Sequence, residues 1–379
     1  MRPLPYRQAA LSTLSLAGGV SLAIIPAATL SIASRTFETT QQGYVSVAIT
    51  GSTFVSQLAF AAIVESRLSS PRSERRVTFP RWLSVLALVA TLSVIVAPTN
   101  AIVLCVALPA LLASLEVGRG VSVAERLDSR ETLAAVLVGL GALAGVGAAY
   151  AGATWGLIPL VVGVFGATIV RSVSVEHRAS SPEPAVMGWV LTDVAITGII
   201  YPVLNTLVLL FIGPVQSVLF AAISTVSGLL AIPLNFMRLR LLKSHSSLDI
   251  WISAATVVLA TGVIGVLEFS GALGFIFRES WTLETTVIPL ATACVWRAAS
   301  IATTLPFAAL RRAGQVRLLA VLRAACALGT FALGLSVLPL HSLTAVFLVM
   351  LLGEVAQAVA YGIAHRRITR HNPELGTRP

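Results

Sequence analysis

Charged residues are scarce in this sequence. Asp, Glu, Lys and Arg together account for 11% of the 379 residues, whereas about 25% is usual for a soluble domain. Apolar residue types account for 56%, and the mean hydropathy is +0.89. A domain in water cannot bury that much apolar surface, so the composition argues against a soluble enzyme and against a nucleic-acid-binding protein. The net charge of +10 must therefore be interpreted from the positions of the basic residues.

Cysteines and catalytic motifs are scarce as well. The three cysteines, Cys105, Cys294 and Cys326, lie singly within apolar runs, so no disulfide framework, zinc site or redox pair is expected. The sequence contains no GxxxxGK(S/T), HExxH or GxSxG motif, and its five histidines show no spacing typical of a metal site. We therefore expect no enzymatic activity and no cofactor or metal.

Long apolar runs fill most of the chain. A membrane-spanning helix needs about 20 apolar residues, and the longest runs hold two spans each because turn residues such as Gly213-Pro214 interrupt them. The sequence therefore predicts an all-α, polytopic membrane protein with twelve transmembrane helices and no soluble domain. We place the spans near residues 9–33, 42–66, 80–97, 101–118, 131–151, 154–171, 186–211, 214–237, 250–275, 285–310, 318–337 and 340–364.

The basic residues alternate in step with these spans. If the N-terminus is cytoplasmic, 22 of the 26 Lys and Arg residues fall in cytoplasmic segments, where positive charge is retained during insertion. One helix more or fewer would scramble this alternation, so we predict that both termini are cytoplasmic. The outer loops are then too short to carry the catalytic groups of a membrane-bound glycan polymerase or ligase.

An even number of spans allows two halves of six helices with the same orientation. Leu-Pro followed by Gly and Arg recurs near the ends of the fourth and tenth spans, at an offset of about half the chain. A segment rich in Ser and Pro, residues 172–185, separates the halves. We therefore predict an N-terminal bundle over residues 1–178 and a C-terminal bundle over residues 179–379, which ends in a short cytoplasmic tail.

An arginine lies near the middle of the tenth span. Ionisable groups at this depth are costly and usually face a cavity or a partner. Helical spacing places Ser300 and Thr304 on the same face as Arg297. A buried guanidinium can bind a phosphate through two hydrogen bonds, so these three residues are candidates for substrate binding. The alternative is a structural ion pair between Arg297 and Glu354, which lies at similar depth in the last span.

Two glutamates within spans are candidates for ion coupling. Glu354 shares a helix face with Gln357 and Tyr361, and a protonatable carboxylate there could couple transport to a proton or sodium gradient. Pairing with Arg297 explains Glu354 equally well. Glu268 lies toward the outer end of the ninth span and is a further candidate for ion coupling or an ion pair.

Further substrate-binding candidates lie in the seventh span and at the end of the first. Asp193, Tyr201 and Asn205 occupy a broadly similar face beside Pro202, which weakens the helix. We predict that this face lines a cavity, with hydrogen bonding between helices as the alternative. Arg35 lies at the outer mouth of the first span, where it can either meet a departing phosphate or remain at the surface.

Small residues in two spans predict how helices pack. Gly141 and Gly145 form a GxxxG pattern in the fifth span, which is typical of close helix packing. The eighth span carries several hydroxyls, among them Ser217 and Ser224, which either line a polar path or bond back to their own helix.

Three segments of the chain resemble a known family. The segments SRTFETTQQGYVSVAI, LPFAALRRAGQVRLLAVLRA and VLPLHSLTAVFLVMLLGEVAQAVAYGIAHRR are similar to the corresponding regions of polysaccharide-transport flippases in the multidrug/oligosaccharidyl-lipid/polysaccharide exporter superfamily. The resemblance implies two bundles around a central cavity that opens alternately to each side of the membrane. It also implies an undecaprenyl-diphosphate-linked oligosaccharide as cargo. The core of the first span lacks the arginines with which lipid II flippases line their cavity, which argues against lipid II itself.

Together these features predict a multi-pass transporter of the bacterial cytoplasmic membrane. Its cargo would be a lipid-linked oligosaccharide for cell-surface polysaccharide biosynthesis, moved by alternating access among membrane lipids, with no nucleic-acid partner. A cation-coupled drug exporter of the same superfamily is the first alternative, although it predicts acidic residues in the core of the N-terminal bundle, which is nearly free of them. A membrane-bound glycan polymerase or ligase and a major-facilitator carrier are the others. The facilitator's Gly- and Asp-containing loop after the second span is absent.

Overall fold

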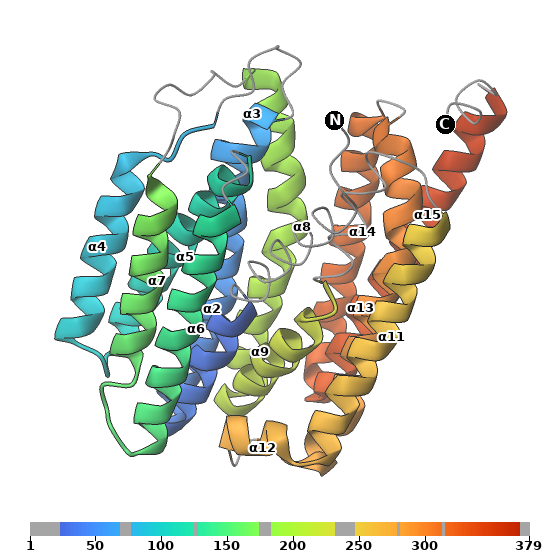
Figure 1. The fold of residues 1–379 in the computed structure, drawn as a ribbon. Coiled ribbons are helices and arrows are strands. Elements are labelled where there is room, and N and C mark those ends of the chain that lie inside the picture. The colour runs from blue at the N-terminus through green and yellow to red at the C-terminus, as the bar shows by residue number, and fades with distance from the viewer. Residues whose placement is uncertain are drawn as a thin grey trace. The chain divides into compact units, whose positions relative to one another are not determined.

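The computed structural model describes residues 23–68, 77–124, 128–173, 183–231, 247–278, 281–312 and 315–371, and within these ranges it contains helices and no strands (Figure 1). Besides a helical segment over residues 23–36, the long helices are α2 (Thr39–Phe60), α4 (Arg81–Val96), α5 (Ala101–Ala124), α6 (Asp128–Tyr150), α7 (Leu157–Ser172), α8 (Pro184–Phe211), α9 (Pro214–Gly228), α11 (Ser247–Phe269), α13 (Leu283–Arg312), α14 (Val316–Val337) and α15 (Leu343–His371). The short elements are η1 (Ala61–Glu65) and α3 (Ser66–Leu68), which continue α2, and α12 (Ala272–Phe277) and η3 (Leu338–Leu340).

The predicted all-α, polytopic fold is confirmed. Within the described ranges a helix occupies each of the twelve predicted spans, and the first part of the span at 9–33 lies outside the described residues. α9 ends at Gly228, whereas the sequence predicts a span to 237, and the last part of that span also lies outside the described residues. The cytoplasmic location of both termini stays a prediction.

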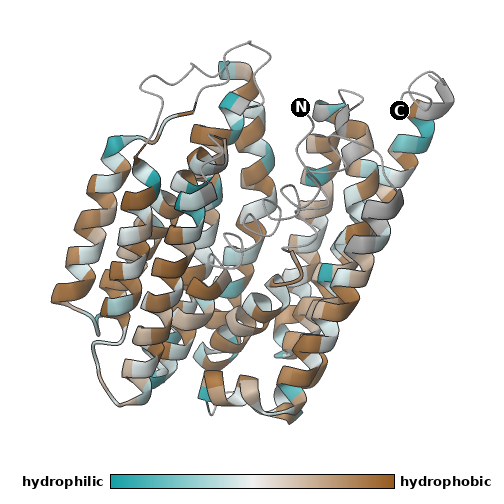
Figure 2. Ribbon diagram, viewed as in Figure 1, coloured by the Kyte–Doolittle hydropathy of each residue, from teal (hydrophilic) through white to brown (hydrophobic). Residues whose placement is uncertain are grey.

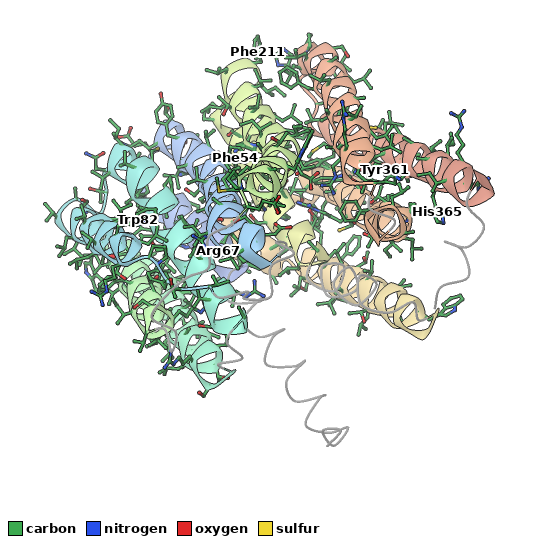
Figure 3. The ribbon with its side chains drawn as sticks, turned by 90° about the horizontal axis from the view of Figure 1, so that it is seen from above. Phe54, Arg67, Trp82, Phe211, Tyr361 and His365 are labelled. Carbon is green, nitrogen blue, oxygen red and sulfur yellow. The ribbon has the colours of Figure 1, made fainter. Side chains whose placement is uncertain are left out.

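The helices have the length and composition of membrane spans. In the described part of the chain, seven are long and apolar enough to cross a membrane, and four shorter apolar helices accompany them. Figure 2 shows that hydrophobic residues predominate along these helices and that the end of α15 is hydrophilic. Large apolar side chains remain exposed, among them Trp82 on α4 (Figure 3) and Val258 on α11. Exposure of such side chains along whole helices is expected where lipid surrounds the protein.

The chain divides into two compact units. The first comprises Met1–Leu209 and Gly213–Ala222, and the second comprises Leu210–Ile212 and Ile223–Pro379. α8 and the first part of α9 therefore belong to the first unit by their contacts, although the sequence predicts a boundary after residue 178. The division into two six-helix bundles at residue 178 stays a prediction.

Within the first unit, α5 packs against α2, α4 and α7, and α6 packs against α7. The α6–α7 contact is made directly between backbones. A Cβ added at Gly141 would lie 2.6 Å from the Pro159 carbonyl oxygen, and one added at Gly163 would lie 2.6 Å from the Leu137 carbonyl oxygen. The close helix packing predicted from the GxxxG pattern is confirmed.

Substitution of Gly141 by alanine is expected to destabilise the protein by about 1–3 kcal/mol, because the new methyl group would overlap the Pro159 carbonyl. Gly139 on the same helix is the matched control, since nothing lies within 4 Å of a Cβ built there. Gly139→Ala is expected to raise stability by up to about 1 kcal/mol, because alanine favours the helix. Thermal unfolding of the detergent-solubilised protein, followed by circular dichroism, measures both changes. Equal shifts in the two variants would show that the close approach is not tight.

Within the second unit, α13 packs along α15, and α14 packs on α15. The Trp296 and Phe347 rings lie 6.5 Å apart, and Thr303 contacts Glu354, so the same offset of 51 residues relates both pairs. A constant offset means that α13 and α15 run in the same direction. At one end of these helices Phe307, Leu310, Leu319 and Tyr361 form a buried apolar cluster.

Candidate functional site

An uncharged polar cluster is buried in the first unit, where α2, α8 and α9 meet. The Asn205 Oδ1 atom accepts a hydrogen bond of 3.0 Å from Ser217, and its Nδ2 atom lies 3.3 Å from Thr50 Oγ1. Ser46 Oγ lies 2.6 Å from Ser217 Oγ, and all four residues are at most 2% exposed. Asn205 thus forms hydrogen bonds between helices, which was the alternative to cavity lining. Its contact with cargo stays a prediction.

Ser46 and Thr50 were not among the residues selected from the sequence. They lie one helical turn apart in the second span and therefore share a face. This spacing could have indicated from the sequence that the two residues belong to one polar group. Nothing in the sequence indicated that this face meets Asn205, because that contact depends on how three helices pack.

Two other candidates of α8 lie near the polar cluster. The Tyr201 ring stacks on Phe220 of α9 with a centroid distance of 5.2 Å, one turn away from the contact of Asn205 with Ser217. Tyr201 and Asn205 therefore share a face, as predicted. Asp193 lies two turns earlier and is partly buried, and its carbonyl oxygen accepts a hydrogen bond from Thr197. A role of Asp193 or Tyr201 in substrate binding stays a prediction.

Arg35 belongs to the first unit and lies at the end of the helical segment over residues 23–36. Its guanidinium lies over the Tyr150 ring, 3.7 Å from the centroid, and its Nη1 atom donates a 2.8 Å hydrogen bond to the Ser31 carbonyl oxygen. These contacts tie the helical segment over 23–36 to the end of α6. They fix the position of the charge, whereas its encounter with a phosphate stays a prediction.

The first unit also contains a buried ion pair that the sequence analysis missed. Arg171 donates from Nε to Glu131 Oε1 at 2.9 Å and from Nη2 to Oε2 at 2.8 Å, and both side chains are at most 5% exposed. A Cβ added at Gly118 would lie 2.9 Å from Arg171 Cβ, so α5 makes room for the arginine stem. Glu131 begins α6 and Arg171 ends α7, so the antiparallel hairpin brings them together. A glutamate at the start of one helix and an arginine at the end of the next are each favoured by the helix dipole, so these two positions could have indicated the pair from the sequence.

Glu268 is buried at the end of α11 and is only 3% exposed. Its Oε2 atom accepts a 2.7 Å hydrogen bond from Trp281 Nε1, and its Oε1 atom lies 2.5 Å from Thr286 Oγ1 of α13. Both partners are uncharged, so in the part of the chain that the structure describes Glu268 is held by neutral donors. Its role in ion coupling stays a prediction.

Arg297 is partly buried on α13. Its guanidinium lies over the Trp296 ring, 4.0 Å from the centroid. The hydroxyl of Ser300 donates to the Arg297 carbonyl oxygen at 2.6 Å, and that of Thr304 donates to the Ser300 carbonyl oxygen at 2.7 Å. The three candidates thus lie together on α13, with a stacked cation beside two hydroxyls that bond back to their own helix.

Glu354 of α15 contacts α13 at a point nearer the C-terminal end of α13 than Arg297. Its Oε1 atom is 2.6 Å from Thr303 Oγ1, and one turn later Gln357 Nε2 donates a 2.9 Å hydrogen bond to Tyr361. Arg297 precedes Thr303 by six residues, which is about 9 Å along the helix axis. This separation explains why Thr303, which was not selected from the sequence, is the neighbour of Glu354. The ion pair between Arg297 and Glu354 stays a prediction.

No group of three or more His, Cys, Asp or Glu side chains that could hold a metal ion occurs among the described residues. The polar side chains instead form separate groups within each unit. The first unit has an uncharged cluster around Asn205 and a buried ion pair. The second unit has a stacked guanidinium and two carboxylates, and all three lie on or against α13.

Comparison with known proteins gives similarity in structure but not in sequence. No protein-family model matches the chain, and no curated protein matches it. The outward-facing conformation of a multidrug resistance MATE family transporter of the MOP superfamily is similar, with 13% identity, a TM-score of 0.50 and coverage of 95% of each chain. A MATE protein in the bent conformation is also similar, with 13% identity, a TM-score of 0.47 and coverage of 97% of this chain and 96% of that one. A MOP superfamily transporter from Pyrococcus furiosus has 13% identity, a TM-score of 0.43 and coverage of 97% of this chain and 89% of that one.

The first of these likenesses shows that the chain shares the fold of a MOP superfamily transporter. This fold is the one that the resemblance noted in the sequence implies. At 13% identity it does not distinguish a polysaccharide flippase from a drug exporter, so the cargo must be inferred from the residues of this chain.

Proposed function

We propose that this protein is a transporter that moves a lipid-linked oligosaccharide across the bacterial cytoplasmic membrane by alternating access. The apolar helices, the two compact units and the fold shared with a MOP transporter support transport as the general function. In the proposed cycle the two units move relative to each other, and the charged head of the cargo crosses while its lipid tail stays in the bilayer. The glycan would then serve cell-surface polysaccharide biosynthesis.

The cation on α13 is the observation that carries this proposal. Arg297 lies within Leu283–Phe307, a span of 25 residues, where a charge is costly and is usually functional. The Trp296 ring attracts the guanidinium charge through the ring face, whereas a phosphate accepts hydrogen bonds from guanidinium N–H groups, so one guanidinium can make both kinds of contact. A planar cation held inside an apolar span matches a diphosphate head group.

The residues beside Arg297 suit the sugar part of the same cargo. Ser300 and Thr304 donate their hydroxyl hydrogens to their own helix, and each oxygen keeps lone pairs that can accept a hydrogen bond from a sugar hydroxyl. A diphosphate next to a glycan therefore finds a cation and hydroxyl acceptors within two turns of one helix.

Reconstitution tests the proposed function. The purified full chain in liposomes is expected to move an undecaprenyl-diphosphate oligosaccharide, labelled on its sugar, between leaflets faster than protein-free liposomes do. Deletion of the gene is expected to reduce the surface polysaccharide of the host. Unchanged leaflet exchange together with intact surface polysaccharide would show that the cargo is something else.

A cation-coupled drug exporter is the second candidate. Glu268 and Glu354 are carboxylates held on or against α13, which favours ion coupling, and the structure with a TM-score of 0.50 is a multidrug resistance transporter. The same liposomes can be loaded with a proton or sodium gradient and offered a fluorescent lipophilic cation. Gradient-driven movement of this dye, without movement of the glycan, would favour the exporter.

A further inference from the structure

The Arg297 guanidinium and the two hydroxyls beside it are held in different ways. The Ser300 and Thr304 hydroxyls are short and bond back to carbonyl oxygens of α13, so their own helix fixes them. The Arg297 charge lies at the end of a long side chain, which loses much rotamer freedom when a ligand holds it. A contact that fixes the guanidinium before the ligand arrives therefore strengthens binding at this site.

Trp296 supplies such a contact. Its ring centroid lies 4.0 Å from the Arg297 Cζ atom, which is within the range in which an aromatic face attracts a cation. Consecutive residues of a helix point about 100° apart, so neighbours in the sequence do not face each other. Both side chains must turn toward each other to make this contact, and helix geometry alone does not account for it.

The Trp296 ring is itself supported from the neighbouring helix. Phe347 of α15 is 0% exposed, and its ring centroid lies 6.5 Å from that of Trp296, with an angle of 36° between the ring planes. Aromatic pairs attract each other at this distance, and a fully buried ring in a close-packed interior has little freedom to move. A row of three side chains thus leads from the contact of α13 with α15 to the guanidinium.

We infer that Trp296 is the positioning residue of a phosphate site at Arg297, and that Phe347 holds Trp296 in place. Trp296 does not touch the phosphate in this role, because it acts through Arg297. The inference rests on the proposed function, since the ligand of Arg297 is the diphosphate of the cargo. It adds one residue of α13 and one of α15 that set how tightly the diphosphate binds.

A purely structural role for Trp296 gives a different expectation. If the ring only fills space, its loss is expected to lower the stability and to leave the affinity for phosphate unchanged. Leu310→Ala shows that pattern for comparison, because Leu310 is a fully buried side chain of the same helix, in the apolar cluster with Tyr361. Measuring affinity and thermal stability on the same variants therefore separates the two roles.

Fluorine NMR tests the contact between Trp296 and Arg297 without any cargo. The full chain in detergent, labelled with 5-fluorotryptophan, is expected to give one signal for each of its six tryptophans. The signal that is missing from Trp296→Phe belongs to Trp296. Arg297→Gln is expected to shift that signal, because it removes the charge over the ring. The signal of Trp251, which is 74% exposed on α11, is the internal control and is expected to stay in place.

Titration with inorganic pyrophosphate, followed by calorimetry, tests the effect on the site. Trp296→Leu is expected to weaken pyrophosphate binding by about 2- to 13-fold, which is the cost of ordering one released side chain. Trp296→Phe keeps an aromatic face and is expected to recover part of that affinity. Phe347→Leu keeps both Trp296 and Arg297 and is expected to give a smaller loss in the same direction. Trp251→Leu and Leu310→Ala are expected to bind pyrophosphate as tightly as the wild type.

Two results would overturn the inference alone. One is a Trp296 fluorine signal that does not move in Arg297→Gln, which would show that the contact is absent in solution. The other is a Trp296→Leu variant that binds pyrophosphate as tightly as the wild type does. A wild-type protein that binds no pyrophosphate would contradict the diphosphate cargo of the proposed function, and the inferred site would fall with it. The fluorine signal requires no ligand, so these failures are separate results.

Discussion

Replacing Glu131 with alanine is expected to lower the free energy of unfolding by about 3–5 kcal/mol. The change would leave Arg171 without its carboxylate, although the Arg171 side chain is 0% exposed and lies between α5, α6 and α7. Its Nη1 atom already has no hydrogen-bond partner among the described residues, so the two hydrogen bonds to Glu131 and the electrostatic attraction of Glu131 and Glu116 compensate for burying that charge. An unpaired buried charge is among the costliest defects that a single substitution can create.

Thermal unfolding in detergent measures this effect, and two further variants separate its causes. Glu284→Ala is the matched control, because Glu284 also lies in the first turn of a helix but is exposed. It is expected to cost less than about 1 kcal/mol. The double variant Glu131→Leu with Arg171→Met removes both charges and is expected to recover most of the lost stability, since apolar side chains can replace a buried pair. If Glu131→Ala melts like Glu284→Ala, the pair contributes nothing to folding.

The helices could be predicted from the sequence because the signal for them is local. About 20 apolar residues mark a span wherever they occur, and turn residues such as Gly213-Pro214 mark the breaks. The same local signal located the close contact at Gly141, because small residues at a spacing of four let two helix backbones approach closely. It did not indicate the π-helical turn Ala61–Glu65 that continues α2, nor the contacts that place α8 with the first unit.

The partners of the polar side chains could not be predicted, because they depend on how one helix lies against another. The sequence placed Glu354 and Arg297 at similar depth, but the register of α13 against α15 puts Thr303 opposite Glu354. The same holds for Asn205, whose face was predicted from spacing along α8, while its contacts with Ser46 of α2 and Ser217 of α9 were not. The spacing along one helix shows which face a residue lies on, whereas the packing of two helices against each other decides which residue it contacts.

Replacing Arg297 with alanine is expected to reduce translocation of the diphosphate-linked glycan by about 10- to 100-fold, since a hydrogen bond to a charged group is worth about 1.5–3 kcal/mol and each 1.4 kcal/mol is a factor of ten. The translocation rate of Arg297→Lys is expected to lie between those of the wild type and Arg297→Ala, because lysine keeps the charge but loses the planar guanidinium that binds two phosphate oxygens. The leaflet assay in liposomes measures both variants. Arg366→Gln is the control, because Arg366 is an exposed cation near the end of α15.

The same assay separates cargo binding from the alternative ion pair with Glu354. If Arg297 serves only to neutralise that carboxylate, the double variant Arg297→Ala with Glu354→Gln is expected to regain the transport and the melting temperature lost in the single variant, because no uncompensated charge then remains. If Arg297 binds the diphosphate, removing the carboxylate supplies no new cation, and transport is expected to stay low while the protein remains folded. The proposed function requires the second result, in which Arg297 acts on the cargo although Glu354 accepts a hydrogen bond from Thr303 nearby.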